Sequence, residues 1–379
     1  MQQIRKILFG LLILTQVACE TTTKTKSQAS LSFAYDTLFI TTDGHALDMA
    51  NSPRIYREKN REYYVNYNHV THALYFFDLK EERFSHKIQF VKSGAHKIQA
   101  CNNYAVADSL IFNMTASGLK VLNFDGELTK NLTSKEMLID TAPAYRLTKP
   151  GISIDNLMRL ASDKPSKTLA FPVFDSEIMP GEEGFYENSH LAKYNYETNR
   201  AQLIPIQAPE ELLGKYYYGD LATPHICLRD SLLIYHYHFL PRLFIYNLKN
   251  HSIHTQSFTM KELDHEIKGI KRKNYQNHIR HLKDLFMQSK IHNLIQDPYR
   301  PYYYLIYSVK SEKNGKSGPS EKHLLVFNNN LEKLGECRLD RTFFPEFCVS
   351  EMGLLFRSSE DESYKELPLY VLKVNSKHE

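Results

Sequence analysis

The feature that most limits how this chain can fold is a short pattern that recurs along most of its length. Each copy has an apolar residue, then a mostly aromatic residue three positions later, then an Asp or Asn, as in Leu74, Phe77 and Asp78. The copies end at residues 78, 125, 195, 247, 328 and, in degraded form, 373, so the spacings are 47, 70, 52, 81 and 45. Repeats of about this length are typical of arrays and propellers, in which one supersecondary unit is copied. The pattern therefore predicts six copies of one unit, two of them enlarged by insertions.

Strand-like runs surround the copies. Upstream runs lie at residues 63–68, 104–114, 169–175, 225–238, 302–309 and 347–357. Downstream runs follow five copies, at residues 83–90, 127–132, 201–206, 252–258 and 332–339. Asp125 and Gly126 are typical residues of the tight turn that joins two hairpin strands. Three or four antiparallel strands in each of six units predict an all-β fold, a six-bladed β-propeller.

The sixth copy has no fourth strand, because the sequence ends soon after it. The run FAYDTLFIT at residues 33–41 is the candidate replacement. A ring whose last blade takes its outer strand from the N-terminal part is closed by main-chain hydrogen bonds and has no exposed edge at that point. We therefore expect residues 33–41 to pair with residues 369–374.

Two insertions and one loop interrupt the repeat. Residues 133–167 contain three prolines, with a short helical possibility at 154–160. Residues 259–297 are strongly basic, and their apolar residues are spaced by threes and fours, which predicts one or two amphipathic helices over a face of the disc. The helix-period residues are Ile267, Ile270, Ile279, Leu282, Leu285 and Phe286. The cations of this insertion favour a surface that binds anionic lipid heads or an acidic partner. The alternative is a solvated helix face. Residues 310–322, with two glycines and a proline, predict a flexible loop.

The N-terminal segment has the features of an export signal. Arg5 and Lys6 precede an apolar stretch, and small residues precede Cys19. This order predicts a lipoprotein signal peptide at residues 1–18 and lipid attachment at Cys19, with an uncleaved anchor or an ordinary signal peptide as the alternatives. Residues 19–30 then form a polar tether, and residues 31–379 form the folded domain. Beyond Ala18 no apolar stretch is long enough to cross a bilayer, so we expect a protein anchored to the outer membrane by its lipid, on the periplasmic or the surface face.

Composition excludes some function classes. The net charge is +4 with opposite charges interspersed, which leaves no nucleic-acid footprint. The cysteines after Cys19, at positions 101, 227, 337 and 348, match no zinc pattern, and we expect buried free thiols. The 25 Tyr and 21 Phe suit half-buried strands.

Motifs for catalysis or metal binding are weak. His236 and His238 would lie on one face of a strand, with His225 on the preceding strand, but no carboxylate or cysteine at ligand spacing completes a site. We therefore predict no metal and no cofactor. The sequence has no Gly-x-Ser-x-Gly elbow, no Ser-x-x-Lys and no glycine-rich phosphate cradle. Catalytic residues scattered around a propeller funnel would leave no local motif, so an enzyme remains the alternative.

Three segments carry a family resemblance. They are YDTLFI at 35–40, LIQDPYRPYYY at 294–304 and FFPEFCVSEMGLL at 343–355. Together they resemble a family of uncharacterised lipoproteins of Bacteroidetes-type bacteria, a domain of unknown function for which six-bladed propellers are predicted. An arginine commonly follows the tyrosines of the second segment in that family, where this chain has Leu305. The resemblance implies a location and a fold but no reaction.

In such bacteria, a general O-glycosylation signal resembles Asp followed by Ser or Thr and an apolar residue. Four positions match this pattern: Thr37, Ser109, Thr141 and Ser231. Ordinary turn chemistry is the competing explanation, because Asp-Ser between two strands readily forms an Asx-type turn.

A rigid ring of loops favours recognition over catalysis. The leading hypothesis is a binding or scaffold module for a peptide, glycan or protein partner; the alternative is a hydrolase or lyase acting on an envelope or extracellular glycan or peptide. We expect a monomer that contacts the membrane through its N-terminal lipid. Candidate ligand-binding residues are Asp297, Arg300 and Tyr302, where the basic insertion rejoins the ring, and more weakly Arg146 and His225.

Overall fold

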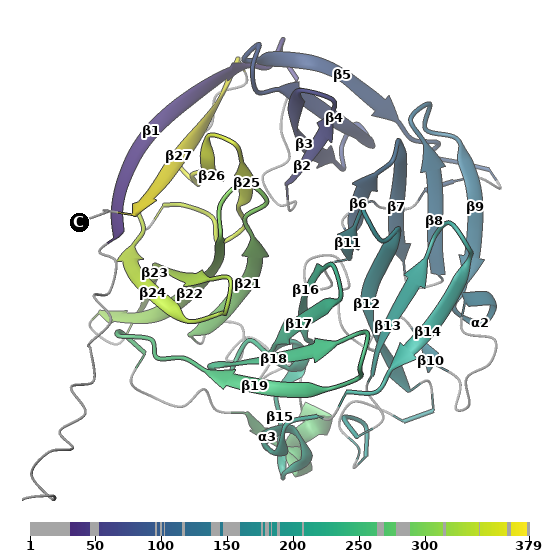
Figure 1. Cartoon of the computed structure of the whole chain (residues 1–379), viewed down its shortest axis with the longest axis vertical. Helices are drawn as coiled ribbons and strands as arrows, with labels where there is room; N and C mark the ends of the chain where they lie inside the picture. Colours follow the sequence, from purple (N-terminus) through teal and green to yellow (C-terminus); the bar gives the residue numbers. More distant parts are fainter. Residues whose placement is uncertain are drawn as a thin grey trace, which may run out of the picture.

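The computed structural model describes residues 31–45, 53–94, 97–98, 101, 103–115, 118–137, 145–146, 160–175, 177–178, 182, 184–187, 190–206, 208–263, 269–277, 289–313, 316–340, 342–361 and 365–376. Over these residues the protein is all-β, as predicted. The described helices are short: α2 (Ser134–Met137), α3 (Glu210–Leu213) and the 3-10 helices η2 (Gly219–Ala222) and η3 (Arg272–Asn277). None of them is long or apolar enough to cross a membrane. Figure 1 shows the strands gathered into sheets that surround a common centre.

The largest sheet has eight strands in the order β2-β3-β4-β5-β1-β27-β26-β25. One half holds β2 (Arg54–Glu58), β3 (Arg61–Asn68), β4 (Ala73–Asp78) and β5 (Arg83–Gln89). The other holds β1 (Leu31–Thr41), β27 (Glu366–Ser376), β26 (Gly353–Phe356) and β25 (Cys348–Ser350). A single parallel pair, Thr41 with Arg83, joins the halves, so each half has the make-up of a four-stranded antiparallel unit.

Three further sheets have four strands each. They are β6 (Tyr104–Ala107), β7 (Leu110–Thr115), β8 (Gly118–Asn123) and β9 (Leu128–Thr133); β16 (His225–Arg229), β17 (Leu232–His236), β18 (Arg242–Asn247) and β19 (Ile253–Ser257); and β21 (Lys290–Gln296), β22 (Tyr302–Lys313), β23 (Lys316–Asn328) and β24 (Lys333–Arg338). A five-stranded sheet holds β10 (Tyr145–Arg146), β11 (Ala161–Asp163), β12 (Thr168–Asp175), β13 (His190–Asn195) and β14 (Arg200–Ile204). The short strands β15 (Tyr216–Tyr217) and β20 (Ile270–Lys271) pair with each other.

The recurring Asp or Asn has a structural explanation. Each of these residues ends the third strand of a unit, and its side-chain oxygen accepts hydrogen bonds from backbone N–H groups of the following turn. Asp78 Oδ1 accepts from Lys80 and Glu81 at 2.9 and 3.0 Å, and Asn328 Oδ1 accepts from Asn330 at 2.9 Å. The equivalent residues in the other units are Asn123, Asn195 and Asn247. The repeat therefore marks Asx turns, and in the second copy the capping residue is Asn123 rather than the predicted Asp125.

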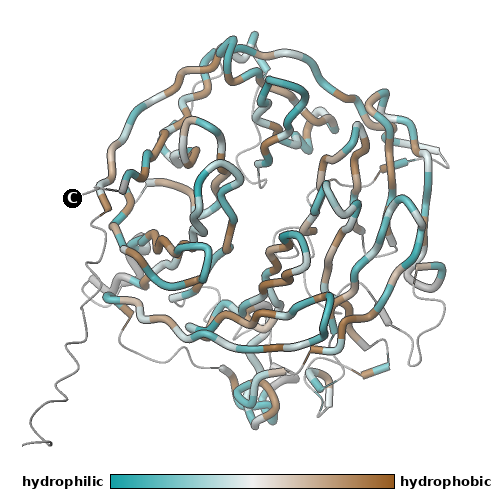
Figure 2. The backbone as a smooth tube through the Cα atoms, viewed as in Figure 1, coloured by the Kyte–Doolittle hydropathy of each residue, from teal (hydrophilic) through white to brown (hydrophobic). Residues whose placement is uncertain are grey.

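The first strands of the units form the inner ring. Neighbouring first strands contact one another in the cyclic order β2, β6, β11, β16, β21, β25 and back to β2. The core lies between adjacent sheets, because alternate residues of a strand face opposite neighbours: Val65 of β3 packs with Ile111 of the next sheet, whereas Tyr64 packs with Leu355 of the previous one. In Figure 2 the central region of β16 and β17 is largely hydrophobic, whereas the outer strand β1 alternates between hydrophobic and hydrophilic residues.

The predicted pairing of the two chain ends is confirmed. β1 runs antiparallel to β27, from Leu31 opposite Ser376 to Thr41 opposite Glu366. Ile40 of β1 is fully buried among apolar residues of β27 and β3, whereas Phe39 points outward and is 55% exposed. Figure 1 shows β1 lying along the outer edge beside β27.

Several expectations need correction or lie outside the described residues. Residues 310–322 are not a loop: β22 and β23 continue their antiparallel pairing to Lys313 opposite Lys316. In the insertion 259–297 the described parts include η3, the short strand β20 and, at its end, β21, so the insertion rejoins the ring earlier than expected. Of the six predicted helix-period residues, all but Ile270 lie outside the described residues, as do the predicted signal peptide, Cys19 and the predicted tether. The expected buried free thiols are confirmed at Cys101, Cys227 and Cys348, whereas the free thiol Cys337 is only half-buried.

Candidate ligand-binding cavity

An axial cavity of about 710 Å³ lies where the first strands meet. Its lining comes from all of them, β2, β6, β11, β16, β21 and β25. Turn residues that follow these strands, such as Lys164, Asp230 and Pro298, complete the lining. We call this side of the ring, where first strands turn into second strands, the turn end. A volume of this size is typical of pockets for small ligands.

The charged groups of the cavity are mostly cations. Its lining includes Arg54, Arg57, Lys164 and Arg229, against the carboxylates of Asp163 and Asp230. Three of the cations have nearby carboxylates: Arg57 Nε lies 2.9 Å from Glu62 Oε1, Lys164 Nζ lies 3.6 Å from Asp108 Oδ1, and Arg229 Nε lies 3.7 Å from Asp230 Oδ2.

Arg54 differs from these cations. It begins β2 and is half-buried; its Nε donates to Tyr104 O at 3.2 Å and its Nη1 to Pro53 O at 3.0 Å. Its guanidinium carbon lies 5.4 Å from the centre of the Tyr104 ring. These partners are backbone carbonyls and an aromatic face, so none of them neutralises the charge of Arg54.

Asp297 and Arg300 lie together in the β21–β22 turn at the turn end. The buried carboxylate of Asp297 accepts from the backbone N–H groups of Tyr299 and Arg300, from Arg300 Nε at 2.5 Å and from Tyr304 Oη at 2.9 Å. Arg300 also donates from Nη1 to Glu351 O and from Nη2 to Ser350 O, at 3.1 and 2.8 Å. This network joins the β21–β22 turn to the β25–β26 turn.

Tyr302, the third candidate, is half-buried next to the same turn. Its carbonyl accepts from Asp297 N at 2.9 Å, and its ring packs on the neighbouring hydrophobic cluster. The sequence therefore located a turn that borders the cavity, since Gln296 and Pro298 line it, but the contacts of Asp297 and Arg300 are those of a brace between two turns.

A second brace crosses the same end of the ring. Glu62 of β3 accepts from Arg57 and from the hydroxyl of Tyr299, and its other oxygen accepts from Glu351 N at 2.9 Å. Burial, followed by the hydrogen bond to Glu62, raises the pKa of Tyr299 above its ordinary value. Both carboxylates, Asp297 and Glu62, are thus engaged by several donors, which suits a structural role better than proton transfer to a substrate.

His225 and Arg146 lie away from Asp297. His225 begins β16, whose last residue, Arg229, reaches the turn end, so His225 is at the opposite end of the ring. Arg146 of β10 pairs with Phe174 near the end of β12, which also places its backbone at the opposite end. The structure therefore does not bring these two candidates to the Asp297 turn.

His225 belongs to a cluster of three histidines, with His236 and His238. His225 Nε2 lies 2.5 Å from His238 Nε2, and His238 Nδ1 lies 2.5 Å from Ile291 O. Nδ1–H of His238 donates to that carbonyl, so His238 Nε2 can accept a hydrogen bond from His225 only when His238 is neutral. Burial lowers the pKa of His236, which stacks on His225, to about 4. Among the described residues, no group of three or more His, Cys, Asp and Glu side chains is placed to hold a metal ion.

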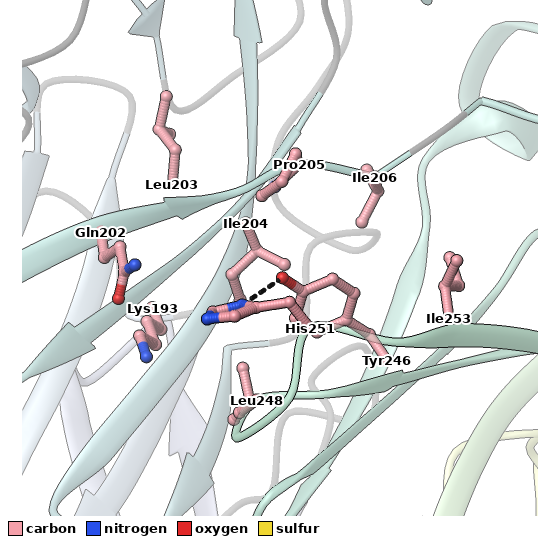
Figure 3. Close-up of a pocket in the computed structure, with 10 residues that line it drawn as sticks. All are labelled: Lys193, Gln202, Leu203, Ile204, Pro205, Ile206, Tyr246, Leu248, His251 and Ile253. Carbon is pink, nitrogen blue, oxygen red and sulfur yellow. Dashed lines mark hydrogen bonds between the residues drawn. The ribbon is translucent and has the colours of Figure 1, made fainter.

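A second hollow of about 560 Å³ lies between the outer strands of two sheets, β13–β14 and β18–β19. Figure 3 shows that aliphatic side chains, among them Ile204, Leu248 and Ile253, form much of its wall, with Tyr246 hydrogen-bonded to His251 at 2.8 Å. This hollow lies on the periphery and offers few polar groups to orient a ligand.

Three of the four glycosylation-like positions are described. Thr37 is exposed on β1, Ser109 is exposed in the β6–β7 turn and Ser231 is half-buried in the β16–β17 turn, whereas Thr141 lies outside the described residues. Asp108 and Ser109 both have positive φ, 50° and 59°, so turn geometry alone accounts for that pair. Modification remains a prediction that an intact-mass measurement on native protein tests.

The sequence did not reveal Arg54. Its strand, β2, has only five residues, and the prediction for the first unit began with the second strand. The available signal was the short strand-like run of Ile55, Tyr56 and Arg57, which is followed by the turn residues Lys59 and Asn60.

Comparisons with known proteins agree on one family and fold. The model of the family described as "Domain of unknown function (DUF4221)" matches residues 28–338. The crystal structure of a member of the DUF4221 family from Bacteroides vulgatus superposes with a TM-score of 0.68 at 17% identity, over 92% of this chain and 99% of that one. A putative exported protein from Bacteroides fragilis superposes with a TM-score of 0.52 at 12% identity, over 93% and 98%. No curated protein matches this chain significantly.

Proposed function

The chain belongs to the DUF4221 family, which confirms the family resemblance, and from this premise we propose that it is a six-bladed β-propeller that binds a ligand in its axial cavity. Each blade would be one four-stranded unit, with β1 completing the last. The cyclic contacts of the first strands and the antiparallel pairing of β1 with β27 support this arrangement.

The observation that carries the binding function is the cavity itself. It is about 710 Å³ in volume and is lined by every first strand, so the ring holds its walls in place. Charged side chains from different strands converge on it, which is how a pocket gains specificity. Near the cavity, the carboxylates of Asp297 and Glu62 brace neighbouring turns. In its lining, Asp163 accepts from Ser166 N, and Asp230 lies 3.7 Å from Arg229 Nε. A binding module therefore fits better than a hydrolase or lyase.

We place this module in the cell envelope. The export signal at residues 1–18 and the lipid attachment at Cys19 are read from the sequence alone. Metabolic labelling with a fatty acid tests this location: the label should enter the wild-type protein and be absent from a Cys19→Ser variant. The ligand would be a peptide, a glycan or part of a partner protein.

A substitution that fills the cavity tests the binding function. Ser162 of β11 lines the cavity and is exposed, so Ser162→Trp adds bulk there with little effect on the core. Ser85 is equally exposed on the outer strand β5, and Ser85→Trp is the matched control. The natural chain has no Trp, so each variant also carries a single Trp fluorophore.

Binding of the wild-type protein to glycan and peptide arrays should be lost in Ser162→Trp and kept in Ser85→Trp. At high concentration, a ligand that still enters the cavity of Ser162→Trp should change the fluorescence of its indole. The fluorescence of Ser85→Trp should not change. Equal binding by both variants would place the ligand site elsewhere, and an absence of ligands for the wild-type protein would remove support for a binding module.

A further inference from the structure

The axial cavity contains one cation whose charge no carboxylate balances among the described residues. Of the five N–H donors of the Arg54 guanidinium, Nε–H and one on Nη1 are taken by backbone carbonyls. The remaining donors have no partner in the part of the chain that the structure describes. Arg57 and Arg229, the other arginines of the cavity, each lie next to a carboxylate.

The surroundings of Arg54 are poorly solvated. Tyr104, under its guanidinium, and the nearby Cys101 are completely buried. Burial raises the pKa values of both groups, and the charge of Arg54 opposes that shift in each. A cation in such a place attracts an anion more strongly than one in water, because the effective dielectric constant is lower.

Lys164 adds a second positive charge at the edge of the cavity. It is 59% exposed in the β11–β12 turn, and its carboxylate, Asp108, is shared with Lys167, whose Nζ lies closer at 2.6 Å. The charge of Lys164 is therefore only partly balanced. Arg54 and Lys164 come from different sheets and line the same cavity.

We propose that the axial cavity binds an oxyanion, a carboxylate, sulfate or phosphate, on the free N–H donors of Arg54, with the charge of Lys164 adding attraction from the other end of the cavity. A planar guanidinium with adjacent free donors matches two oxygens of such a group. The inference rests on the proposed function in one respect, that the cavity is the ligand site. It adds the chemical class of ligand.

Binding is measured by calorimetry with sodium sulfate, sodium phosphate and sodium glucuronate, with sodium chloride holding the ionic strength constant. Arg54→Gln should weaken the binding of at least one of these anions by about tenfold or more, and Lys164→Gln by a few-fold. Arg338→Gln is the matched control, because Arg338 is 63% exposed on the outer strand β24 and pairs with Glu321. This control should bind as the wild-type protein does. Binding of glucuronate alone identifies an acidic sugar as the source of the oxyanion, and binding of the inorganic ions identifies a free anion.

A crystal of the wild-type protein soaked in selenate keeps the test decisive if Arg54→Gln does not fold. The anomalous signal should lie against the guanidinium of Arg54. The inference fails if no anion binds the wild-type protein, if Arg54→Gln binds as well as the wild-type protein does, or if selenate lies elsewhere. Array ligands that Ser162→Trp excludes, but that bind regardless of Arg54, would leave the proposed function intact and overturn only the anion.

Discussion

The pairing of β1 with β27 makes a strong prediction about stability. Ile40 of β1 is completely buried against apolar residues of both β27 and β3. Ile40→Ala removes three carbon groups, worth about 0.8 kcal/mol each when buried, so the transfer loss is about 2.4 kcal/mol. The cavity left behind adds a further term, and the total loss of unfolding free energy should be about 3 to 4 kcal/mol.

The matched control is the adjacent residue of the same strand. Phe39 is 55% exposed, so Phe39→Ala should change the unfolding free energy by about 0.5 kcal/mol or less. Urea denaturation followed by far-UV circular dichroism measures both values. The loss for Ile40→Ala should appear in the main unfolding transition, because β1 is part of a sheet. A loss below about 1 kcal/mol, or one equal to that of Phe39→Ala, would show that β1 is a peripheral strand and refute the closure of the ring.

Three other substitutions test separate features. Asp297→Ala breaks a buried ion pair with Arg300 and should lower the unfolding free energy by about 3 to 5 kcal/mol in thermal denaturation; a loss near zero would contradict the brace. The folded pKa of His236, about 4, is below its unfolded value, so the stability from its neutral form is full above about pH 6.5 and is lost as the pH falls towards 4. By pH 5 that loss is roughly 2 kcal/mol, and His236→Phe should lack this component in urea denaturation at pH 7 and pH 5; an unchanged pH dependence would contradict it. Gly118 has φ +152°, and an added Cβ would meet a backbone oxygen at 2.0 Å, so Gly118→Ala should lower the melting temperature, whereas Gly214→Ala, with its nearest atoms at 3.9 Å, should not.

The sequence predicted the third strands well because their ends carry a chemical requirement. Asp78 and Asn328 must cap a turn, and that need left a readable mark in each of the first five units. The pairing of residues 33–41 was likewise predictable from the missing fourth strand. The first strands were predicted less completely. The runs 104–114, 225–238 and 347–357 include β6, β16 and β25, whereas β2, β11 and β21 lie outside the predicted runs. β11, with three residues, is too short to show a period.

The candidate site was harder to predict than the fold. Charged motifs in the β21–β22 turn drew attention to Asp297 and Arg300, yet their charges satisfy each other and two backbone carbonyls. Arg54 stands out because no carboxylate among the described residues pairs with it. A linear sequence does not show which carboxylates lie near a given cation. Arg54 and Lys164 share a cavity only because the ring brings together strands that are about a hundred residues apart.

The antiparallel pairing of the chain ends decides how this protein should be mounted on a biosensor. Leu31 lies opposite Ser376, beyond the start of β26, and so on the same side as the turns that border the cavity. A capture tag joined after β27 would therefore hold that side against the chip. Val70, 70% exposed between β3 and β4 at the other end of β3, offers a position for a single biotin that leaves the turn end facing the flow.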